Sequence, residues 1–317
     1  MRQKRIEEID FLRGILIILM VLFHLVYIGD TYPIAKRIVY SFHMPAFLII
    51  SGYLTNTNKT PRSFARSMMW IVVPYAIMES CYIAGASYFP ITEHIDGLSL
   101  TVFFDRLVFH PLGLYWYLHT LVICSSAYYI VVYRLKRLDL LSRLILCGML
   151  LYLLSCLEIV GLSNAIYYTI GVAIRQKGLS FGYIFKSNLC CLVPIPFLCC
   201  SDNLNSSTIE GYAMTYFMMC SLLCFYKRRT VSPLVFIGIN TLPIVLFSPL
   251  FTILAKSFQP IMLSVDSSGL LFAIAATVFT ISGCLAIAMI MDYMGITRFF
   301  IGRKTFLVNL CSVHVKK

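Results

Sequence analysis

Long apolar stretches follow one another along almost the whole sequence, and they constrain the fold more than any other feature. All but the short sixth have the length, about 17 to 25 residues, that a helix needs to cross a bilayer. The ten stretches lie at residues 9–28, 37–54, 67–89, 114–133, 143–160, 163–174, 183–200, 208–226, 233–255 and 269–291. Only 13% of the 317 residues are charged, about half the share typical of soluble domains. The sequence therefore predicts an all-α polytopic membrane protein, a bundle of about ten transmembrane helices that forms a single domain over residues 1–317.

Basic residues lie in short clusters between these stretches and predict the topology. With the N-terminus in the cytoplasm, the inner loops collect the clusters, as the positive-inside rule requires. The only basic residues in the outer loops are then Lys36, Arg37, Arg106 and Lys256. Omitting the short sixth span would place the basic run at 227–229 outside, so we keep it. We expect both termini in the cytoplasm, a multi-pass location in the cell (inner or plasma) membrane, and no nucleic-acid partner despite the net charge of +12.

The first predicted helix carries three ionisable residues, Asp10, Arg13 and His24. Arg13 and His24 are separated by roughly three helical turns plus 20°, a rise of about 16 Å, so they share one face at different depths. Asp10 lies three residues before Arg13 on that face. Ionisable residues inside a membrane are functional candidates by default. The alternative is that Arg13 reaches lipid headgroups and His24 makes a buried contact.

Further polar residues gather at the predicted outer side of the membrane. His43 opens the second helix there, and Tyr115, Trp116 and His119 open the fourth. An interfacial aromatic belt would explain the tyrosine and tryptophan. It does not explain why three histidines, His24, His43 and His119, lie at one depth. Glu79 lies midway along the third helix, where a carboxylate should be paired or protonated. It either supports catalysis or is hydrogen-bonded to a neighbouring helix.

The predicted inner side carries basic residues instead. Arg62 and Arg66 precede the third helix and are expected close to Arg13. Such arginines form either an ordinary positive-inside loop or a site for phosphate groups. The twelve cysteines show neither CxxC pairs nor metal-ligand spacing, so we expect no disulfide framework and no metal site.

Several motifs in order resemble those of the membrane-bound acyltransferase family 3. They are residues 10–14 with His24, which resemble an Arg-x10-His motif, residues 42–53 (FHMPAFLIISGY), Arg66 with Pro74-Tyr75, Trp116-Tyr117-Leu118, and residues 236–242 (FIGINTL). The chain looks like the short, stand-alone type of the family, which is similar to fucose-acetylase-like and other surface-sugar O-acetyltransferases. It departs from the family at residues 246–249 (LFSP), where relatives often have a histidine.

The resemblance implies transfer of an acyl group, most simply acetyl, from cytoplasmic acetyl-CoA to a hydroxyl of a surface polysaccharide or lipid-linked sugar. Acyl-CoA would be a co-substrate, and no cofactor would be bound permanently. Arg13, Arg62 and Arg66 would bind the CoA phosphates, and Asp10 would steady Arg13. His24 would be the general base or the nucleophile. His43, Ser51 or Tyr53 would orient it or stabilise the oxyanion, and Tyr115, Trp116 and His119 would contact the sugar.

Two other classes of protein remain open from the sequence. A transporter or flippase for a polar or glycan substrate would also need ionisable residues and prolines within its helices, although the halves show no inverted repeat. A membrane scaffold would leave Arg13 and His24 unexplained. The sequence leaves open the acceptor sugar, its hydroxyl position, the acyl group, the role of His24, and whether the chain forms a homo-oligomer in the bilayer.

Overall fold

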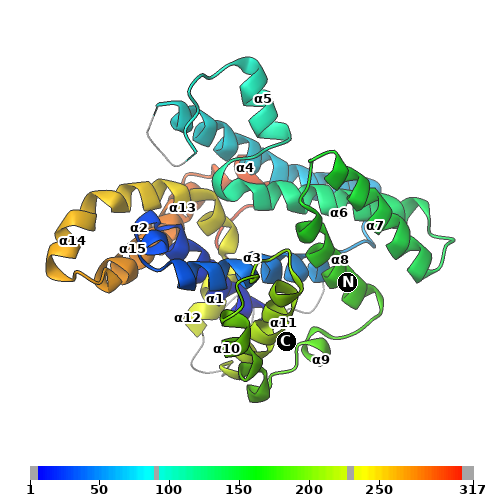
Figure 1. Cartoon of the computed structure of the whole chain (residues 1–317). Coiled ribbons are helices and arrows are strands. Elements are labelled where there is room, and N and C mark those ends of the chain that lie inside the picture. The colour runs from blue at the N-terminus through cyan, green and yellow to red at the C-terminus, as the bar shows by residue number, and fades with distance from the viewer. Residues whose placement is uncertain (1–5, 89–92, 227–231, 309–317) are drawn as a thin grey trace. The chain divides into compact units, whose positions relative to one another are not determined.

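The computed structural model describes residues 6–88, 93–226 and 232–308, and these residues form helices and connecting segments without any strand. The chain divides into two compact units, whose helices are labelled in Figure 1. Unit 1 comprises residues Met1–Phe47, Ser180–Arg298 and Arg303–Lys317. Unit 2 comprises Leu48–Leu179 and Phe299–Gly302. The long helix α3 (Pro33–Leu54) contributes its first part to unit 1 and its last part to unit 2.

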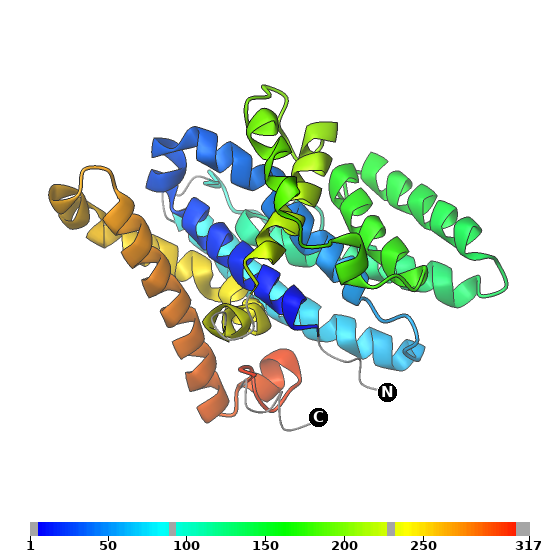
Figure 2. The same cartoon turned by 90° about the horizontal axis from the view of Figure 1, so that it is seen from below.

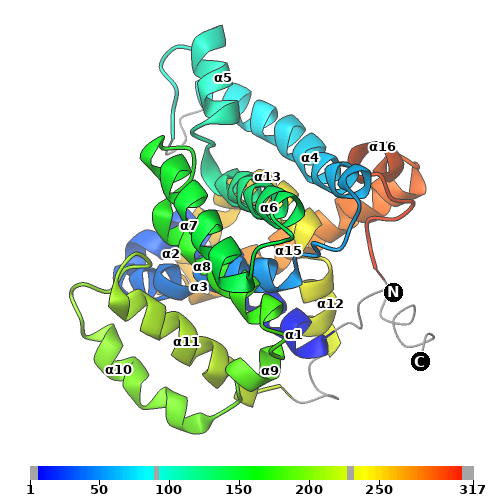
Figure 3. The same ribbon diagram turned by 90° about the vertical axis from the view of Figure 1, so that its right-hand side faces the viewer.

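Unit 1 is built around α1 and the helices that follow the middle of the chain. These are α1 (Glu7–His24), α2 (Val26–Thr31), α9 (Phe181–Ile184), η2 (Leu189–Leu192), α10 (Pro194–Cys199), α11 (Ile209–Cys224), α12 (Ser232–Ile239), α13 (Thr241–Ala255), η3 (Lys256–Phe258), α14 (Gln259–Val265) and α15 (Leu270–Tyr293). In Figure 2, α15 runs beside α13, and Figure 3 shows α10 beside α11. The short helix α16 (Thr297–Ile301) follows α15.

Two glycines allow α1 and α12 to pack backbone against backbone. A Cβ at Gly238 would overlap the Asp10 carbonyl oxygen, and a Cβ at Gly14 would overlap the Leu234 carbonyl oxygen. Small residues at such crossings let membrane helices approach closely, where van der Waals packing is the main stabilising term. The turn of α1 that carries Asp10 and Arg13 is therefore seated directly against α12.

The start of α15 is fixed by a capped turn. The Asp266 carboxylate accepts hydrogen bonds from the backbone N–H of Leu271 (2.8 Å) and from the N–H and hydroxyl of Ser268 (2.9 and 2.6 Å). These bonds hold the pKa of Asp266 below its ordinary value. Gly269 follows with φ +74°, a conformation that glycine adopts without strain.

Unit 2 contains the remaining helices, α4 (Pro61–Tyr88), α5 (Leu100–Val108), η1 (Gly113–Tyr115), α6 (Trp116–Arg134), α7 (Leu140–Cys156) and α8 (Leu162–Gln176). Glycine again permits a close crossing here. A Cβ at Gly52 of α3 would overlap the Tyr168 carbonyl oxygen, and one at Gly171 of α8 would overlap the Ile49 carbonyl oxygen. Beside this crossing, the Tyr168 hydroxyl shares hydrogen bonds with Thr55 (2.7 Å) and Ser125 (3.0 Å).

Four helical stretches of the described residues are long and apolar enough to cross a membrane: Pro61–Tyr88, Gly113–Arg134, Thr241–Val265 and Leu270–Tyr293. Three of them correspond to the third, fourth and tenth expected spans, and Thr241–Val265 overlaps the second part of the ninth. They make this an all-helical membrane protein. Helix α1 is not apolar enough to be counted with them, because its first half contains four charged residues, Glu7, Glu8, Asp10 and Arg13. The total of about ten spans and the cytoplasmic termini stay predictions.

The expected seventh span is wrong as a continuous helix. Residues 183–200 fold instead into the end of α9, the 3-10 turn η2 and the short α10. The Asn188 side chain accepts a hydrogen bond from the Cys190 N–H and starts η2. Pro194 and Pro196 then lack the N–H groups that a continuing helix would need. Apolar composition alone did not reveal these local breaks, nor the break of the ninth span at Asn240, between α12 and α13.

Candidate functional site

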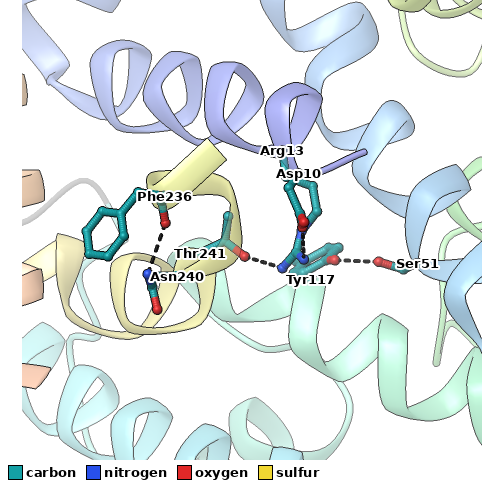
Figure 4. A network of polar contacts seen from close by, with 7 residues as sticks. All are labelled: Asp10, Arg13, Ser51, Tyr117, Phe236, Asn240 and Thr241. Atoms are coloured by element: carbon teal, nitrogen blue, oxygen red, sulfur yellow. Dashed lines mark hydrogen bonds and ion pairs between the residues drawn. The ribbon is translucent and has the colours of Figure 1, made fainter. Parts of the chain in front are cut away.

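Arg13 is held in unit 1 by groups from two helices. Its guanidinium lies 3.6 Å from the Asp10 carboxylate, one turn earlier on α1, and donates a hydrogen bond to the Thr241 hydroxyl at the start of α13 (Figure 4). Asp10 is buried, whereas the Arg13 side chain keeps 25% of its surface exposed. Asp10 and Thr241 thus hold the guanidinium in one orientation, and as a planar, permanently charged group it is the side chain best suited to bind a phosphate or carboxylate.

Asn240 explains why Thr241 lies at that position. It occupies the break between α12 and α13, where its amide nitrogen donates to the Phe236 carbonyl oxygen (2.9 Å) (Figure 4). Its amide oxygen accepts from the Val308 N–H (2.9 Å). Asp292, at the end of α15, accepts from the N–H groups of Phe306 (2.6 Å) and Leu307 (3.1 Å). The two side chains thus bind consecutive backbone groups of residues 306–308 and fix the start of α13.

His24 and His43 both contact the aromatic ring of Tyr40. The His24 ring stacks on Tyr40 at 5.9 Å, and the His43 ring packs against the same tyrosine at 5.2 Å. Tyr40 and His43 come from one face of α3, and His24 is the last residue of α1. The sequence predicted His24 and His43 at one depth; the structure brings both against Tyr40, which the sequence analysis did not single out.

Backbone hydrogen bonds fix which nitrogen of each histidine is reactive. The Nδ1 atom of His24 lies 2.7 Å from the Met20 carbonyl oxygen, and that of His43 lies 2.7 Å from the Val39 carbonyl oxygen. A carbonyl only accepts, so each Nδ1 carries the proton and each neutral ring has its lone pair on Nε2. The Nε2 of His43, which is buried, has no hydrogen-bond partner within the described part of the chain. In both neutral rings Nε2 is therefore the unprotonated nitrogen.

The remaining candidates on α3 belong to unit 2. The Ser51 hydroxyl lies 2.7 Å from the Tyr117 hydroxyl of α6 (Figure 4). Tyr53 is buried, with the Arg175 guanidinium of α8 lying 5.5 Å from its ring centroid. Ser51 and Tyr53 are thus fixed by neighbours within their own unit, and their supporting roles stay predictions.

Glu79 anchors the turn that opens α6. Its Oε1 accepts a 2.7 Å hydrogen bond from the Leu112 N–H, and the residue is completely buried. Leu112 directly precedes η1, which leads into Trp116. Of the two interpretations of Glu79, this contact matches the one in which its carboxyl group is hydrogen-bonded to a neighbouring part of the chain.

Two substitutions distinguish a structural role of Glu79 from a catalytic role. Glu79→Ala should lower the free energy of unfolding by about 1–3 kcal/mol, because it leaves the buried Leu112 N–H unpaired. Glu79→Gln retains an acceptor oxygen and should keep both stability and activity. Thermal unfolding in detergent and acyl transfer would be measured for both variants. Full stability with lost activity in Glu79→Gln would assign Glu79 to the chemistry instead.

The aromatic and histidine candidates at the start of α6 are mostly packed. Tyr115 is buried, edge-on to Tyr82 at 5.9 Å, so it offers little surface to a sugar. The Nε2 atom of His119 lies 2.8 Å from the Val108 carbonyl oxygen at the end of α5. Trp116 is half-buried and is the member of the group best placed to contact a ligand.

The basic candidates of α4 are accessible. Arg62 and Arg66 are exposed, one helical turn apart. They belong to unit 2 and Arg13 to unit 1, so an anion site that joins all three stays a prediction. Among the residues the structure describes, no three His, Cys, Asp or Glu side chains are grouped to hold a metal ion.

Thr241 and Asn240 are the polar residues of the site that sequence reasoning left without a role. The sequence signal was the Asn-Thr pair within an otherwise apolar stretch at 236–242. An Asn in a helix-length apolar run competes with the backbone for hydrogen bonds and favours a break. That signal could have located the α12–α13 break, although not its contact with Arg13.

Comparison with known proteins identifies the family. The model of the family described as Acyltransferase domain (acyltransferase family 3) matches residues 6–289, which include every candidate named above. The nodulation protein NolL of Sinorhizobium fredii (strain NBRC 101917 / NGR234) is 31% identical over 156 residues, 44% of this chain and 39% of that relative. The chain thus matches about two fifths of the length of this curated relative. No solved structure matches it. Because the family match extends over most of its length, this helical membrane protein belongs to acyltransferase family 3.

Proposed function

We propose that the protein transfers an acyl group, in the first instance acetyl, from cytoplasmic acyl-CoA to a sugar hydroxyl at the outer side of the cell membrane. The acceptor is a surface polysaccharide or its lipid-linked precursor. The observation that carries the proposal is the pair of Nε2 lone pairs beside Tyr40, reached along α1 from an oriented arginine. Family membership supplies the reaction class, and these side chains supply a base and an anion-binding group.

Arg13 serves the donor end of the reaction. The CoA phosphates bind near its guanidinium, and Arg62 and Arg66 add charge at the cytoplasmic mouth. The acyl-bearing arm then extends along α1 toward His24, about 16 Å away along the helix axis. Asp10 and Thr241 support this role because they hold the guanidinium in place before the donor arrives, which lowers the entropic cost of binding.

His24 serves the acceptor end. Its Nε2 takes the proton of the sugar hydroxyl as the hydroxyl oxygen attacks the thioester carbon. The new C–O bond forms, the C–S bond breaks, and the proton passes to the departing CoA sulfur. In the other route that the lone pair allows, Nε2 itself attacks the thioester and carries the acyl group before the sugar receives it. His43, which contacts the same tyrosine, orients the reacting groups.

Incubation of the purified protein with radiolabelled acetyl-CoA and membrane glycans tests the proposal. We expect release of CoA and label in the glycan. Without acceptor, label that stays on the protein would assign the nucleophilic route, and an unlabelled protein would assign the general-base route. Counterflow of glycan across vesicles without CoA turnover would contradict acyl transfer and favour a transporter.

Thr241 provides a test of the donor end. Thr241→Val keeps the side-chain shape and removes the acceptor of the Arg13 hydrogen bond, which as a bond to a charged group is worth about 1.5–3 kcal/mol. We expect the KM for acyl-CoA to rise about tenfold or more with little change in kcat. Thr241→Ser keeps the hydroxyl and should restore the KM. Steady-state kinetics measure both. Equal KM values for the valine and serine variants would show that Thr241 does not position Arg13.

A further inference from the structure

A partly open cavity of about 220 Å³ with an almost entirely apolar lining lies in unit 1, between side chains of α13, η3, α14 and α15. The lining includes Ala255, Phe258, Met262, Phe272, Ala275 and Phe279. A lining of this kind favours apolar ligands, because a polar group placed there would find no hydrogen-bond partner. The cavity therefore offers space to a hydrocarbon chain and to no polar group of a substrate.

Helix α2 joins this cavity to the histidine site. The Tyr27 ring lies edge-on to Phe272, with ring centroids 6.2 Å apart, and the Tyr32 hydroxyl donates a 2.7 Å hydrogen bond to the Ser268 carbonyl oxygen. A Cβ at Gly269 would press on the Tyr27 ring. Since α2 begins two residues after His24, the wall of the cavity and the candidate base are connected through one short helix.

The positively charged side chain of Lys36 also lies against α2. The Lys36 side chain crosses Gly29, where an added Cβ would come within 3.1 Å of it. Its Nζ lies 3.8 Å from the Asp30 carboxylate and 5.8 Å from the centroid of the Tyr40 ring, on which His24 stacks. Lys36 is also one of the few basic residues of the predicted outer loops. An ammonium group, a base and an apolar cavity thus adjoin one short helix.

We propose that the acceptor is a lipid-linked sugar whose hydrocarbon chain occupies the α13–α15 cavity. Its phosphate faces Lys36, and its sugar reaches Nε2 of His24. The three features match the three parts of such a molecule: tail, anion and hydroxyl-bearing head. This inference rests on the proposed function and selects the lipid-linked precursor over the finished polysaccharide.

Photo-crosslinking tests the site with a defined probe, a long-chain isoprenoid phosphate that bears a diazirine on its tail. The protein is placed in vesicles of phosphatidylethanolamine and phosphatidylglycerol, irradiated, and mapped by mass spectrometry. We expect labels between Ala255 and Phe279 that unlabelled isoprenoid phosphate removes and added phosphatidylglycerol does not. Ala275→Leu fills the cavity and should reduce labelling at least tenfold, and Lys36→Gln should reduce it several-fold.

Val278→Leu is the matched control, because Val278 is exposed on the same helix and does not line the cavity. It should label like the wild type. Labels scattered over all lipid-facing helices, or removed equally by phosphatidylglycerol, would show bulk lipid and overturn the inference. This competition uses the wild type and so does not depend on a variant that folds.

Acyl transfer is measured in parallel. Transfer without specific cavity labelling overturns the lipid site alone, whereas cavity labelling without transfer overturns the proposed function and the acceptor assignment with it.

Discussion

Replacement of His24 by alanine is expected to lower kcat for acyl transfer by about 100- to 10,000-fold, the usual contribution of a positioned acid or base. The Met20 carbonyl oxygen fixes the proton on Nδ1, so the variant loses the only lone pair that this ring presents. The KM for acyl-CoA should change little. The proposed phosphate contacts lie at Arg13, about 16 Å away along α1, and do not involve the imidazole.

Acetyl transfer by detergent-purified protein, together with its thermal unfolding, checks this prediction. His24 ends its helix and is not fully buried, so the variant should unfold near the wild-type temperature. His110→Asn is a matched control, because it removes an exposed imidazole that pairs with Asp105 at 2.9 Å outside the proposed site. Wild-type kcat in His24→Ala would exclude His24 as base or nucleophile. An equal loss in both variants would point to a non-specific effect.

The sequence predicted most of the helical architecture because helix-length apolar runs and charged breaks are local signals. It also predicted that Asp10, Arg13 and His24 share a face of one helix, since helical periodicity follows from sequence spacing alone. The ion pair between Asp10 and Arg13 is the expected contact at that spacing. The basic clusters of the loops likewise predicted His24 and His43 at one depth, although not their contact with a shared tyrosine.

Contacts between distant segments could not be predicted in this way. Thr241 is 228 positions from Arg13, and no periodicity relates them; their contact depends on the break at Asn240. The tautomers of His24 and His43 depend on carbonyl groups one turn earlier, whose availability the sequence does not show. Glu79 was expected to be paired or protonated, but its partner is the Leu112 backbone N–H, a group common to all non-proline residues and therefore without a sequence signal.

Gly238→Ala is expected to prevent unit 1 from folding normally, because the new methyl group would occupy the position of the Asp10 carbonyl oxygen. Overpacking by flexible side chains typically costs about 1–3 kcal/mol. Here the neighbour is helix backbone, which cannot turn aside, so we expect a larger loss. The helices α1 and α12 would have to separate, and α12 leads through Asn240 to Thr241. Arg13 would then lose the hydroxyl that holds it, and any protein that did fold should have weakened acyl-CoA binding.

Gly148→Ala is the matched control and should have the opposite effect. Gly148 lies within α7, and a Cβ there would contact nothing within 4 Å. Alanine is favoured over glycine in a helix by about 1 kcal/mol, so this variant should be unchanged or slightly more stable. Yield of monodisperse protein and thermal unfolding in detergent compare the two. Similar behaviour of the two variants would show that α1 and α12 do not cross as closely as described, and that the seating of Arg13 does not depend on this crossing.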